Sequence, residues 1–199
     1  MSNAVKVKIS PAAILLLAAF VWLSSLRLLA AILLAALCHE LGHYLVLRRL
    51  GGRLSGVSIT ALGAEMRMAP GSRLSYGEEL LATAAGPGTN LLLSLLLAFL
   101  GRRAPTCYLW SGVNLMLGLF NLLPITPLDG GSMLWLGAAW MTEPYTADRV
   151  AENVGLAVSA VLLALTIRWS IASGGGGVFL ILMALWLFVG SMKRKWSTA

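Results

Sequence analysis

Charged residues are scarce in this chain. Only 12% of its 199 residues are Asp, Glu, Lys or Arg, whereas 58% are hydrophobic. A soluble globular domain carries about 25% charged residues, so this composition excludes an ordinary soluble domain. Apolar stretches of about 20 residues, the length that crosses a bilayer, recur along the chain. About six such spans leave no room for a sizeable soluble domain, and we expect residues 1–199 to form a single membrane-embedded domain.

Cysteine is also rare, with two residues in the whole chain. Cys38 and Cys107 form no CxxC spacing, which excludes a cysteine-rich metal motif. Cys38 directly precedes His39, so a sulfur ligand is one interpretation. We favour the alternative, an inert buried thiol.

The net charge of +7 does not indicate nucleic-acid binding. The Lys and Arg residues lie in short connections between apolar runs, and no basic face is interleaved with aromatic residues. With six spans, 11 of the 15 Lys and Arg residues fall on the side that holds both termini, against 4 on the other side. The positive-inside rule then predicts cytoplasmic termini.

The expected fold class is an all-α polytopic membrane protein. Residues 2–4, Ser-Asn-Ala, resemble an expression-tag scar and are left out of the fold prediction. Residues 131–142 are apolar but too short to span, and we interpret them as a broken or interfacial continuation of the fourth helix. We predict six transmembrane helices over residues 9–26, 27–48, 77–101, 106–123, 150–167 and 174–192.

A short stretch after the second predicted helix has a different pattern. Apolar and polar residues alternate in residues 53–68, and Leu62-Gly63 can turn the chain. A period of two predicts a short β-hairpin. An irregular surface loop is the alternative.

The two histidines of the chain stand together in HELGH, residues 39–43, inside the second apolar run. Helical spacing puts His39 and His43 on one face, one turn apart, where both imidazoles can reach a single Zn²⁺. Glu40 can accept a proton from the attacking water. The alternative is a chance match in a helix, but ionisable residues within the membrane are usually functional.

A catalytic zinc site usually needs a third protein ligand, and Asp129 is our candidate. It lies in NLLPITPLDGG, residues 121–131, where Pro124 and Pro127 break the fourth helix. Zn²⁺, Asp129 and an ionised Glu40 sum to zero charge with neutral histidines, which lowers the cost of a site below the membrane surface. The alternative is that Asp129 caps the next helix.

These motifs resemble the site-2 protease family of intramembrane zinc metalloproteases. HELGH, AAGPGTN (residues 84–90) and NLLPITPLDGG occur in the family's order, so the resemblance covers residues 27–131. It implies a Zn²⁺ cofactor bound by His39, His43 and Asp129, with Glu40 as general base. It also implies that Asn90 and Asn121 position substrate or stabilise the oxyanion. Each asparagine could instead form hydrogen bonds between helices.

Gly86, Pro87 and Pro124 are further expected substrate-site residues, because Gly86 and Pro87 would leave room for an unwound substrate to reach the site. The arrangement is most similar to the sporulation branch, whose members cleave a membrane-associated pro-sigma factor. Ser132 departs from that family, where a basic residue often follows the two glycines.

The resemblance therefore implies a protease in a bacterial plasma membrane that acts on a membrane-tethered protein. Any membrane protease can also have inhibitory or scaffolding membrane proteins as partners, and the sequence identifies none. Two alternatives use the same residues, namely a transporter or channel for divalent metal ions and an inactive scaffold. Intact HELGH with Asp129 argues against the scaffold, and a base beside the ligands argues against the transporter.

Overall fold

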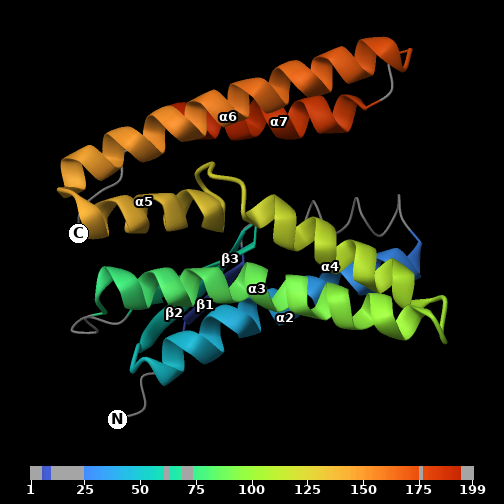
Figure 1. Ribbon diagram of the computed structural model, residues 1–199, viewed down its shortest axis with the longest axis horizontal. Coiled ribbons are helices and arrows are strands. Elements are labelled where there is room, and N and C mark those ends of the chain that lie inside the picture. The colour runs from blue at the N-terminus through green and yellow to red at the C-terminus, as the bar shows by residue number, and fades with distance from the viewer. Residues whose placement is uncertain (1–5, 10–24, 61–62, 69–73, 175–176, 194–199) are drawn as a thin grey trace. The chain divides into compact units, whose positions relative to one another are not determined.

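The computed structural model describes residues 6–9, 25–60, 63–68, 74–174 and 177–193. These residues form six helices, α2 to α7, and three strands (Figure 1). The chain divides into two compact units, Met1–Leu119 and Phe120–Ala199. The first predicted helix, residues 9–26, falls almost wholly outside the described residues and stays a prediction.

Helices α2 and α3 form the core of the first unit and pack against each other (Figure 1). Helix α2, Leu26–Arg49, begins where the Ser25 side chain accepts a hydrogen bond from the Leu28 N–H. Helix α3, Tyr76–Gly101, begins with a capping box between Ser75 and Glu78. A capping box satisfies two otherwise free N–H groups, which fixes the start of the helix. Both helices lie within one residue of their predicted bounds.

A three-stranded sheet belongs to the same unit. Strand β2, Leu54–Thr60, pairs antiparallel with β3, Gly63–Met68, where the sequence predicts the hairpin. Strand β1, Lys6–Ile9, pairs parallel with the other side of β2 and places Lys6 opposite Gly56. Strand β1 is not predictable from the sequence, because its four residues carry too little periodicity and its partner is distant in the chain.

The next helices differ from the prediction at several of their ends. Helix α4, Cys107–Asn121, ends two residues before its predicted end, and α5, Asp129–Met141, is a separate helix. The predicted break after the fourth helix is present, and residues 129–141 form a helix of their own after it. Helix α6, Pro144–Ala172, begins six residues before the predicted start at Val150. A proline suits the first turn of a helix, and the apolar pattern used for the prediction cannot detect a polar first turn.

Helices α6 and α7, Val178–Lys193, lie side by side in the second unit (Figure 1). The segment between α4 and α5 packs into this unit, where Ile125, Leu128 and Leu187 form a buried core. Ile125 has no exposed surface, and Leu187 of α7 has 1%. This burial holds the loop that precedes α5 against the helical pair.

Three of the described helices, α2, α3 and α6, are long and apolar enough to cross a membrane. In addition, α7 contains a shorter apolar stretch, Leu180–Met192. Many large apolar side chains on these helices are exposed, including Leu95 at 72% and Leu92 at 71%. Exposing so many apolar side chains to water would cost a large free energy, whereas contact with lipid does not. The chain is an integral membrane protein.

Candidate metal centre

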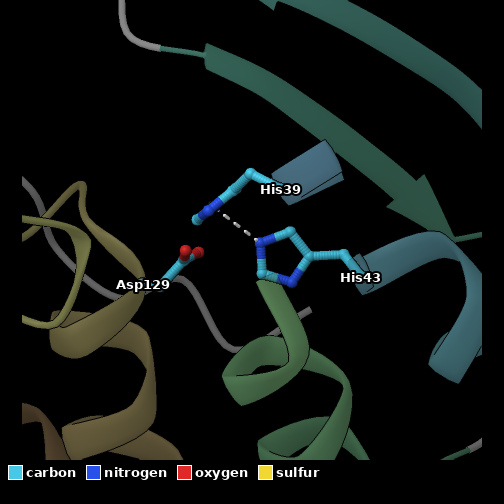
Figure 2. A group of neighbouring side chains, drawn as sticks. All are labelled: His39, His43 and Asp129. Atoms are coloured by element: carbon cyan, nitrogen blue, oxygen red, sulfur yellow. Dashed lines mark hydrogen bonds between the residues drawn. The ribbon is translucent and has the colours of Figure 1, made fainter. Parts of the chain in front are cut away.

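The two histidines of α2 lie on the face that packs against α3. His39 is buried, with 6% of its surface exposed, and His43 is half-buried. Their Nε2 atoms lie 3.1 Å apart, as the dashed line in Figure 2 shows. The spacing of four residues in a helix produces this approach, as the sequence predicts.

The other ring nitrogen of each histidine faces an oxygen of α3. His39 Nδ1 lies 2.7 Å from the side-chain oxygen of Asn90, and His43 Nδ1 lies 2.9 Å from the backbone carbonyl of Ala82. A carbonyl oxygen only accepts hydrogen bonds, so each Nδ1 carries the proton and donates it. Each Nε2 of the neutral ring is then an acceptor.

Two acceptors that face each other at 3.1 Å repel unless a cation lies between them. With zinc–nitrogen bonds of about 2.0–2.1 Å and tetrahedral angles, two ligand nitrogens lie about 3.3 Å apart. The Nε2 separation is close to this value. A metal-binding histidine also usually donates one ring N–H to an oxygen and binds the metal through its other nitrogen, as Nδ1 and Nε2 could do here. The donor set therefore fits Zn²⁺.

Glycines bring α2 and α3 close enough for these contacts. A Cβ atom added at Gly86 of α3 would overlap the His43 ring, lying 2.7 Å from its Cδ2 atom and nearer still to Nε2 and Cε1. On α2, an added Cβ at Gly42 would lie 2.7 Å from the Ala85 carbonyl. The room that Gly86 leaves is thus occupied by His43. Pro87 beside it is fully buried.

Asn90 is also fully buried, with no exposed surface. Its side-chain nitrogen donates to the Ala35 carbonyl at 3.1 Å and to the side-chain oxygen of Asn114 at 2.9 Å. Asn90 therefore joins α2, α3 and α4 while it holds the His39 ring. This arrangement favours the helix-bridging role that the sequence analysis gave as the alternative.

Asp129 belongs to the second unit, where it is the first residue of α5. The loop before it folds tightly over the start of this helix. A Cβ atom added at Gly130 would overlap the backbone carbonyls of Leu122 and Leu123, and one at Gly131 would lie 2.7 Å from the Ile125 carbonyl carbon. The two glycines after the aspartate are thus required by close backbone contacts, and they fix the place of Asp129 at the end of the loop.

Three further predicted site residues, Glu40, Asn121 and Pro124, lie close in sequence to the histidines or to Asp129. Glu40 follows His39 on α2 and is half-buried. Asn121 is the last residue of α4, and Pro124 lies in the loop before α5; both are half-buried. Roles for Asn121 and Pro124 stay predictions.

Figure 2 draws the side chains in the described part of the chain that could hold one metal ion, which are His39, His43 and Asp129. Cys38 is not a member of this group, although it precedes His39. Because Asp129 belongs to the other unit, its binding to the same ion is part of the proposal below.

Comparison with known proteins agrees with this chemistry. Residues 101–166 match the family model of peptidase family M50. A solved site-2 protease from Methanocaldococcus jannaschii superposes with a TM-score of 0.70, covering 97% of this chain and 93% of that chain at 24% identity. The chain contains a peptidase family M50 domain with the site-2 protease fold.

Relatives of this domain include proteins named for zinc proteolysis and for sporulation. The chain is 34% identical over 190 residues to Rip3 of Mycobacterium tuberculosis, named as a candidate zinc metalloprotease, with 83% of this chain covered. It is 26% identical over 167 residues to a zinc metalloprotease of Methanocaldococcus jannaschii, with 79% covered. It is 30% identical over 115 residues to stage IV sporulation protein FB of Bacillus subtilis, covering 56% of this chain and 40% of that protein. The chain spans 45% and 46% of the first two relatives, about half their length.

Asn114 was not among the predicted site residues, although it completes the hydrogen-bond network around Asn90. Asn114 is buried, with 3% exposed, and its nitrogen donates to the Trp110 carbonyl at 2.8 Å. The available signal was an asparagine within the apolar run of the fourth helix. That signal does not say which residue Asn114 contacts.

Proposed function

We propose that this chain is an intramembrane zinc endopeptidase that hydrolyses a peptide bond in a membrane-tethered protein. The observation that carries the proposal is the histidine pair of α2. Both Nδ1 atoms bond to α3, and the two Nε2 atoms face each other 3.1 Å apart, a spacing that one metal ion can bridge.

His39, His43 and Asp129 are the proposed zinc ligands. Catalytic zinc sites usually have three protein ligands and one open position, so the histidine pair needs one more. The group drawn in Figure 2 supports the Asp129 carboxylate as the third. One carboxylate ligand with two neutral imidazoles leaves one positive charge on the centre, which an ionised Glu40 neutralises. A neutral centre costs less to hold in a membrane than a charged one.

Glu40 is the proposed general base. A zinc ion held by these residues would polarise the scissile carbonyl and acidify the attacking water. The Glu40 carboxylate takes the proton from that water and later delivers it to the leaving amine. Glu40 directly follows His39 in α2, and this neighbouring position supports the proposed role.

The substrate segment must be unwound, because a helix hides its peptide carbonyls in its own hydrogen bonds. Strand β3 is at an edge of the sheet order β1–β2–β3, so we propose that an extended substrate adds beside it. Asn121 and Pro124 are proposed to contact the substrate. The name of the Bacillus subtilis relative, a sporulation protein, makes a pro-sigma factor the first substrate to test.

The proposed topology has six membrane spans in a bacterial plasma membrane, with both termini and the cleavage site on the cytoplasmic side. It is supported by the excess of Lys and Arg on the side of the termini.

The decisive experiment measures zinc content and cleavage together on purified chain in detergent. Wild type, Glu40→Gln and Asp129→Ala are compared on a panel of membrane-tethered substrates that includes a pro-sigma factor. Glu152→Gln is the matched control, because Glu152 is an exposed acid in the middle of α6. We expect stoichiometric zinc in wild type, Glu40→Gln and Glu152→Gln, but cleavage only in wild type and Glu152→Gln.

Asp129→Ala should bind zinc more weakly, by about 10-fold or more, if its carboxylate is the third ligand. Well-folded wild type without zinc would refute the proposal. Zinc that is bound and carried across liposome membranes, with cleavage of no substrate, would instead show a metal transporter.

A further inference from the structure

Asn114 of α4 connects to the histidine pair through a chain of hydrogen bonds with a fixed direction. Its side-chain nitrogen donates to the Trp110 carbonyl, which leaves its side-chain oxygen as an acceptor. That oxygen accepts from Asn90, whose own oxygen accepts from His39 Nδ1. A backbone carbonyl, which can only accept, thus sets the orientation of every group after it.

The direction of this chain decides which nitrogen of His39 carries the proton. If the Asn90 amide were flipped, its oxygen would face the oxygens of Ala35 and Asn114, and two hydrogen bonds would become two repulsions. In the flipped state, the amide nitrogen would face His39 Nδ1, and the histidine proton would move to Nε2. A protonated Nε2 has no lone pair for a metal.

We propose that Asn114 is a positioning residue for the metal centre: by holding the Asn90 amide, it keeps the proton of His39 on Nδ1, so that Nε2 is the nitrogen that can bind a metal. This role rests on the zinc site proposed above. Asn114 touches neither the ion nor the substrate and acts through Asn90. Without Asn114, one of the two acceptors that oppose the flip is lost, so His39 should populate both tautomers.

His43 provides an internal control within the same protein. Its Nδ1 donates to the Ala82 carbonyl, a backbone group that does not involve Asn90 or Asn114. The chain has only two histidines, so ¹⁵N-histidine labelling of metal-free protein gives the NMR signals of two imidazole rings. A His43→Gln variant shows which signals belong to His39. Ring ¹⁵N shifts distinguish Nδ1–H from Nε2–H. Relative to metal-free wild type, we expect a larger Nε2–H fraction for His39 in Asn114→Ala and an unchanged spectrum for His43.

Affinity for Co²⁺, measured by visible absorption on the full chain in detergent, is the second readout. Loss of an outer partner of a metal-binding histidine weakens binding by about 10- to 100-fold, and we expect Asn114→Ala to reach about 10-fold. Ser111→Ala is the matched control, because Ser111 is buried one turn earlier on α4 and bonds Ser94 of α3. It should bind Co²⁺ as wild type does.

A second variant keeps the test valid if Asn114→Ala does not fold. Asn114→Asp with a protonated carboxyl group keeps both a donor for Trp110 and an acceptor for Asn90, so it should preserve the His39 tautomer and Co²⁺ affinity. A single unchanged His39 tautomer and wild-type Co²⁺ affinity in Asn114→Ala would overturn this role and leave the zinc site standing. Wild type that binds no Co²⁺ would overturn the zinc site, and the positioning role with it.

Discussion

Replacement of Gly86 by alanine tests whether the α2–α3 contact sets the geometry of the metal centre. The added Cβ would overlap the His43 ring and lie 2.7 Å from its Cδ2 atom. Carbon atoms in contact normally stay about 3.5–4.0 Å apart, so the ring must retreat by about 1 Å. The hydrogen bond from His43 Nδ1 to the Ala82 carbonyl, 2.9 Å long, opposes that movement.

The cost can be estimated from this clash. Metal–ligand distances tolerate errors of about 0.2 Å, so a 1 Å shift of His43 removes it from the ion unless the helices separate. Added methyl groups in tight packing cost about 1–3 kcal/mol. If that cost falls on the metal-bound state, zinc affinity drops roughly 5- to 150-fold, because each 1.4 kcal/mol is about tenfold.

Chelator competition on the purified chain measures this loss of zinc affinity. Gly88→Ala is the control, since an added Cβ at this position, two residues along the same helix, meets nothing within 4 Å. It should bind zinc as wild type does and unfold at the same temperature or slightly above it, because alanine favours a helix more than glycine. Wild-type zinc affinity in Gly86→Ala would refute the argument that this contact fixes His43.

Three further predictions concern stability and are measured by thermal unfolding in detergent. Gly130→Ala should destabilise the protein by about 1–3 kcal/mol, because the added Cβ would overlap backbone carbonyls at the start of α5. Gly137→Ala in the same helix is the control, since its added Cβ meets nothing within 4 Å and should not destabilise. Equal losses of stability in the two variants would contradict this prediction. Trp135→Phe removes the donor to Asp148 at 2.7 Å and should cost about 1–3 kcal/mol, and an unchanged unfolding temperature would show that this bond between α5 and α6 contributes nothing. Ser75→Ala removes the helix cap of α3 and should cost about 1 kcal/mol, with Ser75→Asp close to wild type; equal losses in both would disprove the capping effect.

The bounds of α2 and α3 could be predicted because apolar runs end there at charged or capping residues. The start of α6 could not, since Pro144 opens a polar first turn before the apolar pattern begins. Strand β1 was missed for a different reason. Its pairing with β2 spans about 50 residues of chain, and short strands depend on such distant partners.

The metal centre shows the same division between local and distant information. His39 and His43 were predicted because their spacing is local to one helix. The acceptors of their Nδ1 atoms come from α3, and the partner of Asn90 comes from α4. No local pattern specifies those contacts, so the role of Asn114 became visible only in the folded chain.

The hydrogen bonds between α2 and α3 also constrain how this protein can move. His39 is tied to Asn90 and His43 to Ala82, and both ties cross the same helix interface. Any hinge that parted these two helices would release both imidazoles from their fixed orientation at once. We therefore expect α2 and α3 to stay together in any motion that keeps both histidines oriented.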